Sequence, residues 1–139
     1  MRALDVATKA LARRDFSERG LRERLERSGV DPAETERVLA RLRGEGVLDE
    51  ARFAANRAQA LAGRGKGDEA IRFDLETQGL SGDLIEAALG ELEPERDRAE
   101  RIVARRGRSS GTARLLAGRG FDSDVVEAVV ASSPGAALG

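Results

Sequence analysis

The sequence predicts an all-α fold in which three tandem three-helix (helix-turn-helix-like) repeats form an elongated, curved array. Composition is the first observation behind this prediction. Ala, Leu, Arg and Glu dominate the 139 residues, Pro occurs three times and aromatic residues make up 3%, which favours helices over sheets. The second observation is that apolar residues recur with helical spacing in short segments that end at glycines. The third is that this pattern occurs three times.

The three copies align around the glycine that ends the second helix of each repeat. Each copy has a leucine four residues before this glycine, an apolar residue directly after it and a glutamate seven residues after it. These positions are Leu25, Gly29, Val30 and Glu36 in the first copy, Leu75, Gly79, Leu80 and Glu86 in the second, and Leu116, Gly120, Phe121 and Glu127 in the third. The sequence therefore predicts repeats at 1–46, 47–93 and 94–132, followed by a disordered tail at 133–139. Units of about 45 residues are small, so we expect them to depend on their neighbours.

The first repeat contains three helix signals. The face that its first helix is expected to bury is Leu4, Ala7 and Leu11, with Val6 and Ala10 beside it. The second helix is expected to start after Ser17 and the third after Asp31, because Ser and Asp side chains accept a hydrogen bond from the first helical turn. Pro32 fits the first position of the third helix.

The middle repeat has the clearest pattern. Asp49 is the expected N-cap of its first helix, and the glycines at 63, 65 and 67 end that helix. The expected apolar stripe is Phe53, Ala54, the stem of Arg57, Ala60 and Leu61. Ile71 and Leu75 then form an i, i+4 core pair that stops at Gly79. The third helix is capped by Ser81, and its inward residues are Leu84, Ile85, Ala88 and Leu89.

The third repeat follows the same plan. Pro94 is expected at the first position of a helix that runs to about Arg106, with Ala99, Ile102 and Val103 facing inward. A short helix carries Leu115 and Leu116. The last helix is capped by Asp122 or Ser123, and its apolar residues are Val125, Val126, Val129 and Val130.

Several functional classes are disfavoured by what the sequence lacks. There is no Cys for a disulfide or a thiolate metal site, and no His for general base catalysis or metal binding. Paired carboxylates such as Asp49-Glu50, and the recurring glutamates, are interpreted as caps or as exposed i, i+4 pairs such as Glu23 with Arg27. We therefore expect neither an enzyme nor a cofactor. The sequence shows no signal-peptide pattern and no apolar run of the ~18 residues that span a membrane, which predicts a cytoplasmic protein without a membrane partner.

Charge is distributed unevenly along the chain. The net charge of −1 combines +2 for residues 1–48, −5 for 49–93 and +2 for 94–139. This balance favours a protein partner over nucleic acid as the main ligand. The candidate cations for binding a partner or DNA are Arg13, Arg14, Arg52, Arg64, Lys66, Arg72, Arg105, Arg106 and Arg108.

Three of these cations are expected to recur at one corner of the repeat, between the first and second helices. They are Arg14, Arg64 and Arg105. A repeated basic corner suits a repeating partner such as a filament or a phosphate backbone. Compensation of the helix dipole explains the same pattern equally well. The glycine-rich segment 63–67 lacks the spacing of a phosphate-binding loop, so we interpret it as a flexible basic connector.

The chain resembles the RecX recombination regulators. The string Leu48-Asp49-Glu50-Ala51-Arg52-Phe53-Ala54 carries most of the likeness, and the other matching segments are 10–17, 42–47, 65–67 with Ile71 and Leu75, 79–80 and 119–121. The resemblance covers roughly residues 3 to 130. It implies tandem three-helix repeats, binding along the groove of the RecA recombinase filament, and inhibition of the RecA ATPase and of strand exchange, with some members also contacting DNA. Homologous recombination, DNA repair and the SOS response are the implied setting.

Two hypotheses from different classes follow. The first is a monomeric, non-catalytic regulator of the RecA filament. The alternative is a DNA-binding protein whose trihelical modules act through phosphate contacts, which predicts a steep salt dependence. Within the middle repeat, Phe53 is interpreted as a core residue rather than a partner contact, whereas Arg52 fits either role.

Overall fold

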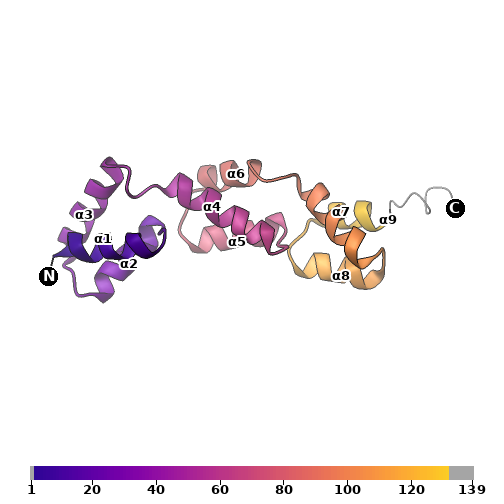
Figure 1. Cartoon of the computed structure of the whole chain (residues 1–139), viewed down its shortest axis with the longest axis horizontal. Coiled ribbons are helices and arrows are strands. Elements are labelled where there is room, and N and C mark those ends of the chain that lie inside the picture. The colour runs from indigo at the N-terminus through magenta and orange to yellow at the C-terminus, as the bar shows by residue number, and fades with distance from the viewer. Residues whose placement is uncertain (1, 132–139) are drawn as a thin grey trace.

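The computed structural model describes residues 2–131, and within this range the chain is all-helical, with no strand (Figure 1). The helices are α1 (Ala3–Arg13), α2 (Glu18–Arg27), α3 (Pro32–Gly44), α4 (Glu50–Gly63), α5 (Asp68–Thr77), α6 (Gly82–Gly90), α7 (Glu95–Arg106), α8 (Ser110–Gly118) and α9 (Ser123–Ala131). They form an N-terminal triplet (α1–α3), a middle triplet (α4–α6) and a C-terminal triplet (α7–α9). Figure 1 shows the triplets arranged end to end, as the repeats predicted. The predicted tail at 133–139 lies outside the described residues. No helix within residues 2–131 is long and apolar enough to cross a membrane.

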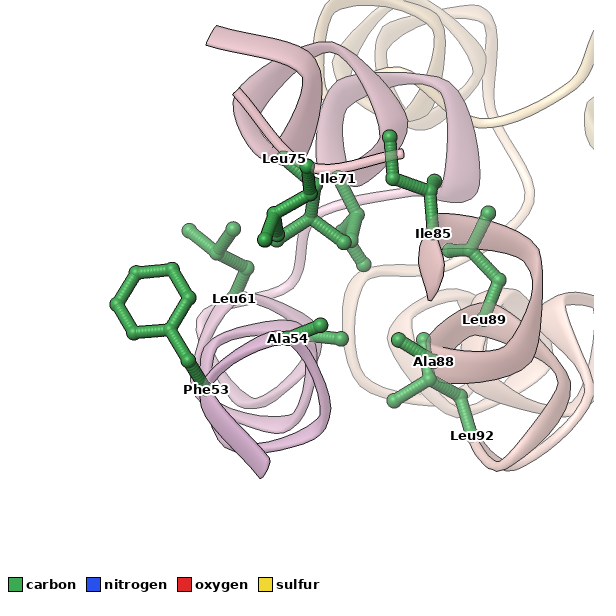
Figure 2. Packing of buried hydrophobic residues seen from close by; sticks show 11 residues of the cluster. Phe53, Ala54, Leu61, Ile71, Leu75, Ile85, Ala88, Leu89 and Leu92 are labelled. Carbon is green, nitrogen blue, oxygen red and sulfur yellow. The ribbon is translucent and has the colours of Figure 1, made fainter. Parts of the chain in front are cut away.

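Each triplet has its own hydrophobic core, in which the three equivalent leucines, Leu25, Leu75 and Leu116, are fully buried. Figure 2 shows the middle core, where Ile71 and Leu75 of α5 point between α4 and α6. Side chains from both of those helices surround this pair, including Ala54 and Leu61 of α4 and Ile85 of α6. Phe53 is also buried, which confirms the prediction that it belongs to the core.

The predicted apolar faces of α4 and α1 need correction. In α4, Ala60 is exposed and Ala58 is fully buried in its place. Because a helix turns 100° per residue, Ala60 lies about 120° from Ala54, outside the buried stripe. In α1, Leu4 and Leu11 are only partly buried, and alanines form the buried face. These alanines are Ala3, Ala7 and Ala10. Small side chains there allow α1 to pack closely on α2 and α3, with the two leucines at the edges.

The ends of the second helices repeat in detail. The glycines that follow them, Gly29, Gly79 and Gly120, have φ angles of 81°, 82° and 88°. The next residue in each copy donates its backbone N–H to the carbonyl of the equivalent leucine, at 3.1 Å for Val30, 3.3 Å for Leu80 and 3.1 Å for Phe121. This is the hydrogen bond of a Schellman turn, which places an apolar residue back over the helix.

The expected N-caps are also present. The side chains of Ser17, Asp31, Asp49 and Ser81 each accept a hydrogen bond from a backbone N–H in the first turn of the helix that follows. In the last helix the cap is Asp122, whose carboxylate accepts from the N–H of Asp124 at 2.7 Å. Pro94 was expected at the first helical position but is the N-cap of α7, with an extended ψ of 140°. A proline suits both positions, because neither backbone nitrogen donates within the helix.

Backbone contacts join the middle and C-terminal triplets. The N-cap residue of α5 is Gly67, which has no side chain to cap the helix. Instead the N–H groups of Gly67 and Glu69 donate to the carbonyls of Arg119 and Gly120, at 2.8 and 3.1 Å, and the N–H of Asp68 donates to the Glu95 carboxylate at 2.7 Å. A Cβ on Gly67 would lie 2.5 Å from backbone atoms of Gly120, so only glycine permits this approach. The N-terminus of α5 is therefore capped by the next triplet.

The N-terminal and middle triplets are joined through side chains. The N–H of Glu18, in the first turn of α2, donates to the Glu50 carboxylate at 2.8 Å. Arg19 reaches the carbonyl of Thr77 at 3.4 Å. Glu50 and Glu95 are each the first residue of a triplet, and each caps the second helix of the preceding triplet. This recurring glutamate cap has no local signal in the sequence, because the paired residues lie far apart in the chain.

Candidate partner-binding surface

The predicted cations lie at three helix connections and on two helices. Arg13 and Arg14 end α1, Arg64 and Lys66 lie between α4 and α5, and the group Arg105, Arg106 and Arg108 lies at the end of α7 and just after it. All of these side chains are exposed. Within residues 2–131 none of them forms an ion pair, although the Arg14 guanidinium lies 4.1 Å from the ring centre of Phe16. These cations are available to a partner with negative charge.

Arg52 and Arg72 are instead engaged within the molecule. Arg52 donates to the carbonyl of Val47 at 3.0 Å and lies 3.7 Å from the Asp49 carboxylate. Arg72 pairs with Glu86 at 2.9 Å and also with Glu69. A partner that binds either arginine must compete with these intramolecular contacts. Arg52 and Arg72 therefore remain predicted site residues, but both already form contacts within the fold.

The corner arginines, Arg14, Arg64 and Arg105, border two hollows between triplets. Arg14 and Arg64 line one hollow of about 250 Å³, whose apolar wall is made by Phe53 and Leu61. Arg105 lines a second hollow of about 220 Å³, together with Gly63 and Gly65. The connection that carries Arg64 therefore lies between the two hollows. Equivalent residues of the repeat are presented at successive junctions.

A buried arginine links the middle and C-terminal triplets. Arg98 is only 7% exposed, and it donates to the carbonyls of Glu93 and Lys66, at 2.9 and 3.0 Å, and to the Asp68 carboxylate. Burial raises the pKa of the nearby Glu95 carboxyl above its usual value, against the lowering effect of its backbone hydrogen bonds. Sequence reasoning missed Arg98. The repeat register offered a signal, because Arg98 precedes Ile102 by four residues as Arg57 precedes Leu61.

Two of the recurring glutamates each form an ion pair with an arginine of the preceding helix. Glu36 of α3 accepts from Arg22 of α2 at 2.7 Å, and Glu86 of α6 accepts from Arg72 of α5 at 2.9 Å. The expected i, i+4 pairing of these glutamates is therefore wrong, because in each ion pair the arginine precedes the glutamate by fourteen residues. In the third copy the position of the arginine is taken by Ala113.

The two Arg–Glu ion pairs predict that the stability of the protein depends on pH. The arginine hydrogen bonds lower the pKa of Glu36 and of Glu86 below their ordinary value of 4.5. A lowered folded-state pKa stabilises the protein above the unfolded-state value, and this contribution is lost as the pH falls through the folded-state value. We expect the urea concentration at the unfolding midpoint to decrease as the pH is lowered below about 4.5. In the Glu36→Gln/Glu86→Gln double variant this decrease is expected to be smaller. The effect is expected to shrink in high salt, because both carboxylates are exposed. Parallel pH curves for the two proteins would contradict this.

The surface of the described residues carries exposed cations at equivalent places of the repeat. No group of three or more His, Cys, Asp or Glu within residues 2–131 is placed to hold a metal ion. Fold and surface together define an all-α protein of tandem three-helix repeats that presents unpaired cations at recurring corners. Models of RecX match two of the triplets, the first three-helix domain at residues 3–42 and the second at residues 49–89. The chain belongs to the RecX family, which confirms the resemblance seen in the sequence.

Relatives agree with this assignment. Regulatory protein RecX of Xanthomonas campestris pv. campestris is 34% identical over 126 residues, covering 84% of this chain and 78% of the relative. The protein of the same name from Halorhodospira halophila is 33% identical over 139 residues, covering 93% and 86%. These relatives are named as regulatory proteins and not as enzymes.

Two crystal structures share the fold. A regulatory protein RecX has a TM-score of 0.80 at 22% identity, covering 94% of this chain and 70% of that one. RecX from Lactobacillus salivarius also has a TM-score of 0.80, at 14% identity, covering 98% and 95%. At these identities the likeness bears on the fold alone.

Proposed function

We propose that this protein is a non-catalytic regulator that binds the RecA recombinase filament and inhibits its ATPase and strand exchange. Acting as a cytoplasmic monomer without a cofactor, it modulates homologous recombination and DNA repair. Membership of the RecX family supports a regulatory role. The observation that carries the rest is the recurrence of unpaired corner arginines at successive triplet junctions.

An end-to-end array suits a partner that itself repeats. A helical filament presents equivalent acidic groups, from protein or from bound DNA, at regular intervals. The corner arginines repeat along this chain in the same way, so one protein molecule contacts more than one filament subunit. Occupying the groove in this manner blocks the second DNA strand sterically and biases filament assembly and ATP turnover.

The RecA ATPase on single-stranded DNA is the test of this proposal. We expect the wild-type protein to inhibit at a substoichiometric ratio to RecA. The triple variant Arg14→Gln/Arg64→Gln/Arg105→Gln removes three exposed charge contacts of roughly 0.5–1 kcal/mol each, which corresponds to a rise of about 10–100-fold in the half-inhibitory concentration. Glutamine keeps most of each stem, so the fold is expected to be retained.

The matched control removes the same charge elsewhere. Arg24, Arg37 and Arg114 are also exposed and have no ion pair within the described residues. Their triple glutamine variant is expected to inhibit like the wild type. Equal weakening of both triple variants would mean that net charge, and not the corner arrangement, drives binding.

One observation favours direct DNA binding as a second candidate function. Arg14 and Arg64 share a hollow with an apolar wall, an arrangement that can hold a phosphate beside a base. The −5 charge of residues 49–93 opposes this function. Titration of single-stranded DNA without RecA at several salt concentrations separates the two. Three phosphate contacts at the corners would give the corner variant a log–log salt slope smaller by about 2.

A further inference from the structure

Phe73 is the aromatic side chain that the fold leaves outside. The chain has four phenylalanines. Phe16, Phe53 and Phe121 are 5–6% exposed, whereas Phe73 in α5 is 68% exposed. Large exposed aromatic side chains are enriched at protein interfaces, because a ring buries much apolar area with few rotatable bonds.

The direction of Phe73 is fixed by the core of α5. Ile71 and Leu75 are fully buried, and Phe73 lies about 180° around the helix axis from their midpoint. The residues on either side of it are both tied to neighbouring helices. Arg72 pairs with Glu86 of α6 at 2.9 Å, and Asp74 accepts from Arg57 of α4 at 2.9 Å. The helix cannot rotate to bury the ring without breaking both contacts.

α5 is also the helix whose two ends contact the two neighbouring triplets. Its first turn donates backbone hydrogen bonds to Arg119, Gly120 and Glu95 of the C-terminal triplet. At its other end the carbonyl of Thr77 accepts from Arg19 of the N-terminal triplet. Helix α5 lies at the centre of the array (Figure 1) and is held at both ends. The exposed Phe73 side chain is therefore carried by a pre-organised platform, and little conformational entropy remains to be lost on binding.

The surroundings of Phe73 are acidic. Glu69 and Glu76, about one turn before and after it, lie within about 60° of it around the helix axis. Glu76 is exposed and has no ion pair within residues 2–131, and the Glu69 side chain is 67% exposed although it contacts Arg72. Carboxylates at this position repel phosphates, so nucleic acid is a poor occupant.

We propose that the Phe73 face, defined as Phe73, Glu69 and Glu76, is a docking surface for an apolar pocket bordered by Lys or Arg side chains on a protein partner. The inference rests on the proposed function, since the filament protein is the partner we assign. In the repeat register the equivalents of Phe73 are Glu23 and Arg114. The Phe73 face thus occurs once in the described triplets and sets the register of the protein on a repeating filament, whereas the corner arginines provide contacts that repeat.

The test uses full-length protein with a fluorescent label, titrated with preformed RecA filaments on single-stranded DNA and a slowly hydrolysed ATP analogue. Phe73→Ala is expected to raise the Kd about tenfold or more. Because the ring is exposed, thermal stability is expected to stay the same. Glu76→Lys is expected to weaken binding as well, by placing a cation against the basic border of the pocket. Glu23→Ala, at the equivalent position of α2, is the control that should bind like the wild type.

The outcomes separate the two proposals. Wild-type binding with an unchanged Kd for Phe73→Ala would overturn the docking surface and leave filament binding standing. Absence of wild-type binding would overturn both. Sedimentation of the free proteins covers the remaining occupant, because a wild-type dimer that Phe73→Ala dissociates would assign this face to a second copy and overturn the assignment to the filament. A weaker Phe73→Ala complex from a monomeric protein supports it.

Discussion

Replacing Gly120 by alanine is expected to destabilise the protein by roughly 2–5 kcal/mol. Two effects combine at this position. Its φ of +88° is a left-handed conformation that disfavours a side chain, at about 1–2 kcal/mol. A Cβ would also lie 2.5 Å from the Cβ and 2.6 Å from the backbone nitrogen of Ala70, and such overpacking costs about 1–3 kcal/mol. The backbone of α5 cannot yield without losing the hydrogen bonds that join the two triplets.

The chain itself supplies variants that separate the two effects. Gly29 has the same role in the N-terminal triplet, with φ of +81° and no atom within 4 Å of an added Cβ, so Gly29→Ala measures the backbone term at about 1–2 kcal/mol. Gly67→Ala measures the contact term, because Gly67 has an ordinary φ of −85° but lies against Gly120. Gly79→Ala is expected to resemble Gly29→Ala, since the nearest atom is on the flexible Arg19 side chain.

Urea unfolding of these four variants is the measurement. The expected order of destabilisation places Gly120→Ala first and Gly29→Ala last or level with Gly79→Ala. If Gly120→Ala and Gly29→Ala were equally destabilised, the close approach of α5 to the turn before α9 would not persist in solution. A large effect of Gly67→Ala alone would locate the strain at the start of α5 rather than at the turn.

The joint between the middle and C-terminal triplets also shows where sequence reasoning stops. The spacing of Leu75 from Gly79, or of Ser81 from its helix, is local, so composition and periodicity were enough to predict those elements. The segment 63–67 was interpreted as a flexible connector because its glycines interrupt a helical pattern. Gly67 is needed instead for its close approach to Gly120, more than fifty residues along the chain. A single sequence contains no signal for such a distant contact.

The candidate partner-binding surface was likewise predicted only in part from the sequence. The register of the repeat predicted that Arg14, Arg64 and Arg105 occupy equivalent corners, and the structure places them at two successive junctions. Residue type alone did not reveal that Arg72 is held by Glu86, because that pairing depends on how α5 packs against α6. Phe73 escaped notice for a similar reason. From residue type alone, a phenylalanine between Ile71 and Leu75 is expected to belong to the core. Only the orientation of the packed helix shows that it faces outward.

Leu75→Ala is expected to cost about 2–5 kcal/mol of unfolding free energy, because it empties a fully buried site among α4, α5 and α6. Leu25→Ala and Leu116→Ala make the same change in the neighbouring cores. The N-terminal triplet is joined to the middle one by side-chain contacts, so Leu25→Ala is expected to let it unfold in a separate early transition. The backbone joint couples the other two triplets, so Leu75→Ala and Leu116→Ala are expected to destabilise one shared transition. Hydrogen exchange during urea unfolding distinguishes these patterns.

A loss well below 1 kcal/mol for Leu75→Ala would mean that the core can collapse around the cavity. A single transition in all three variants would mean that the glutamate cap at Glu50 couples the first junction as firmly as the backbone couples the second.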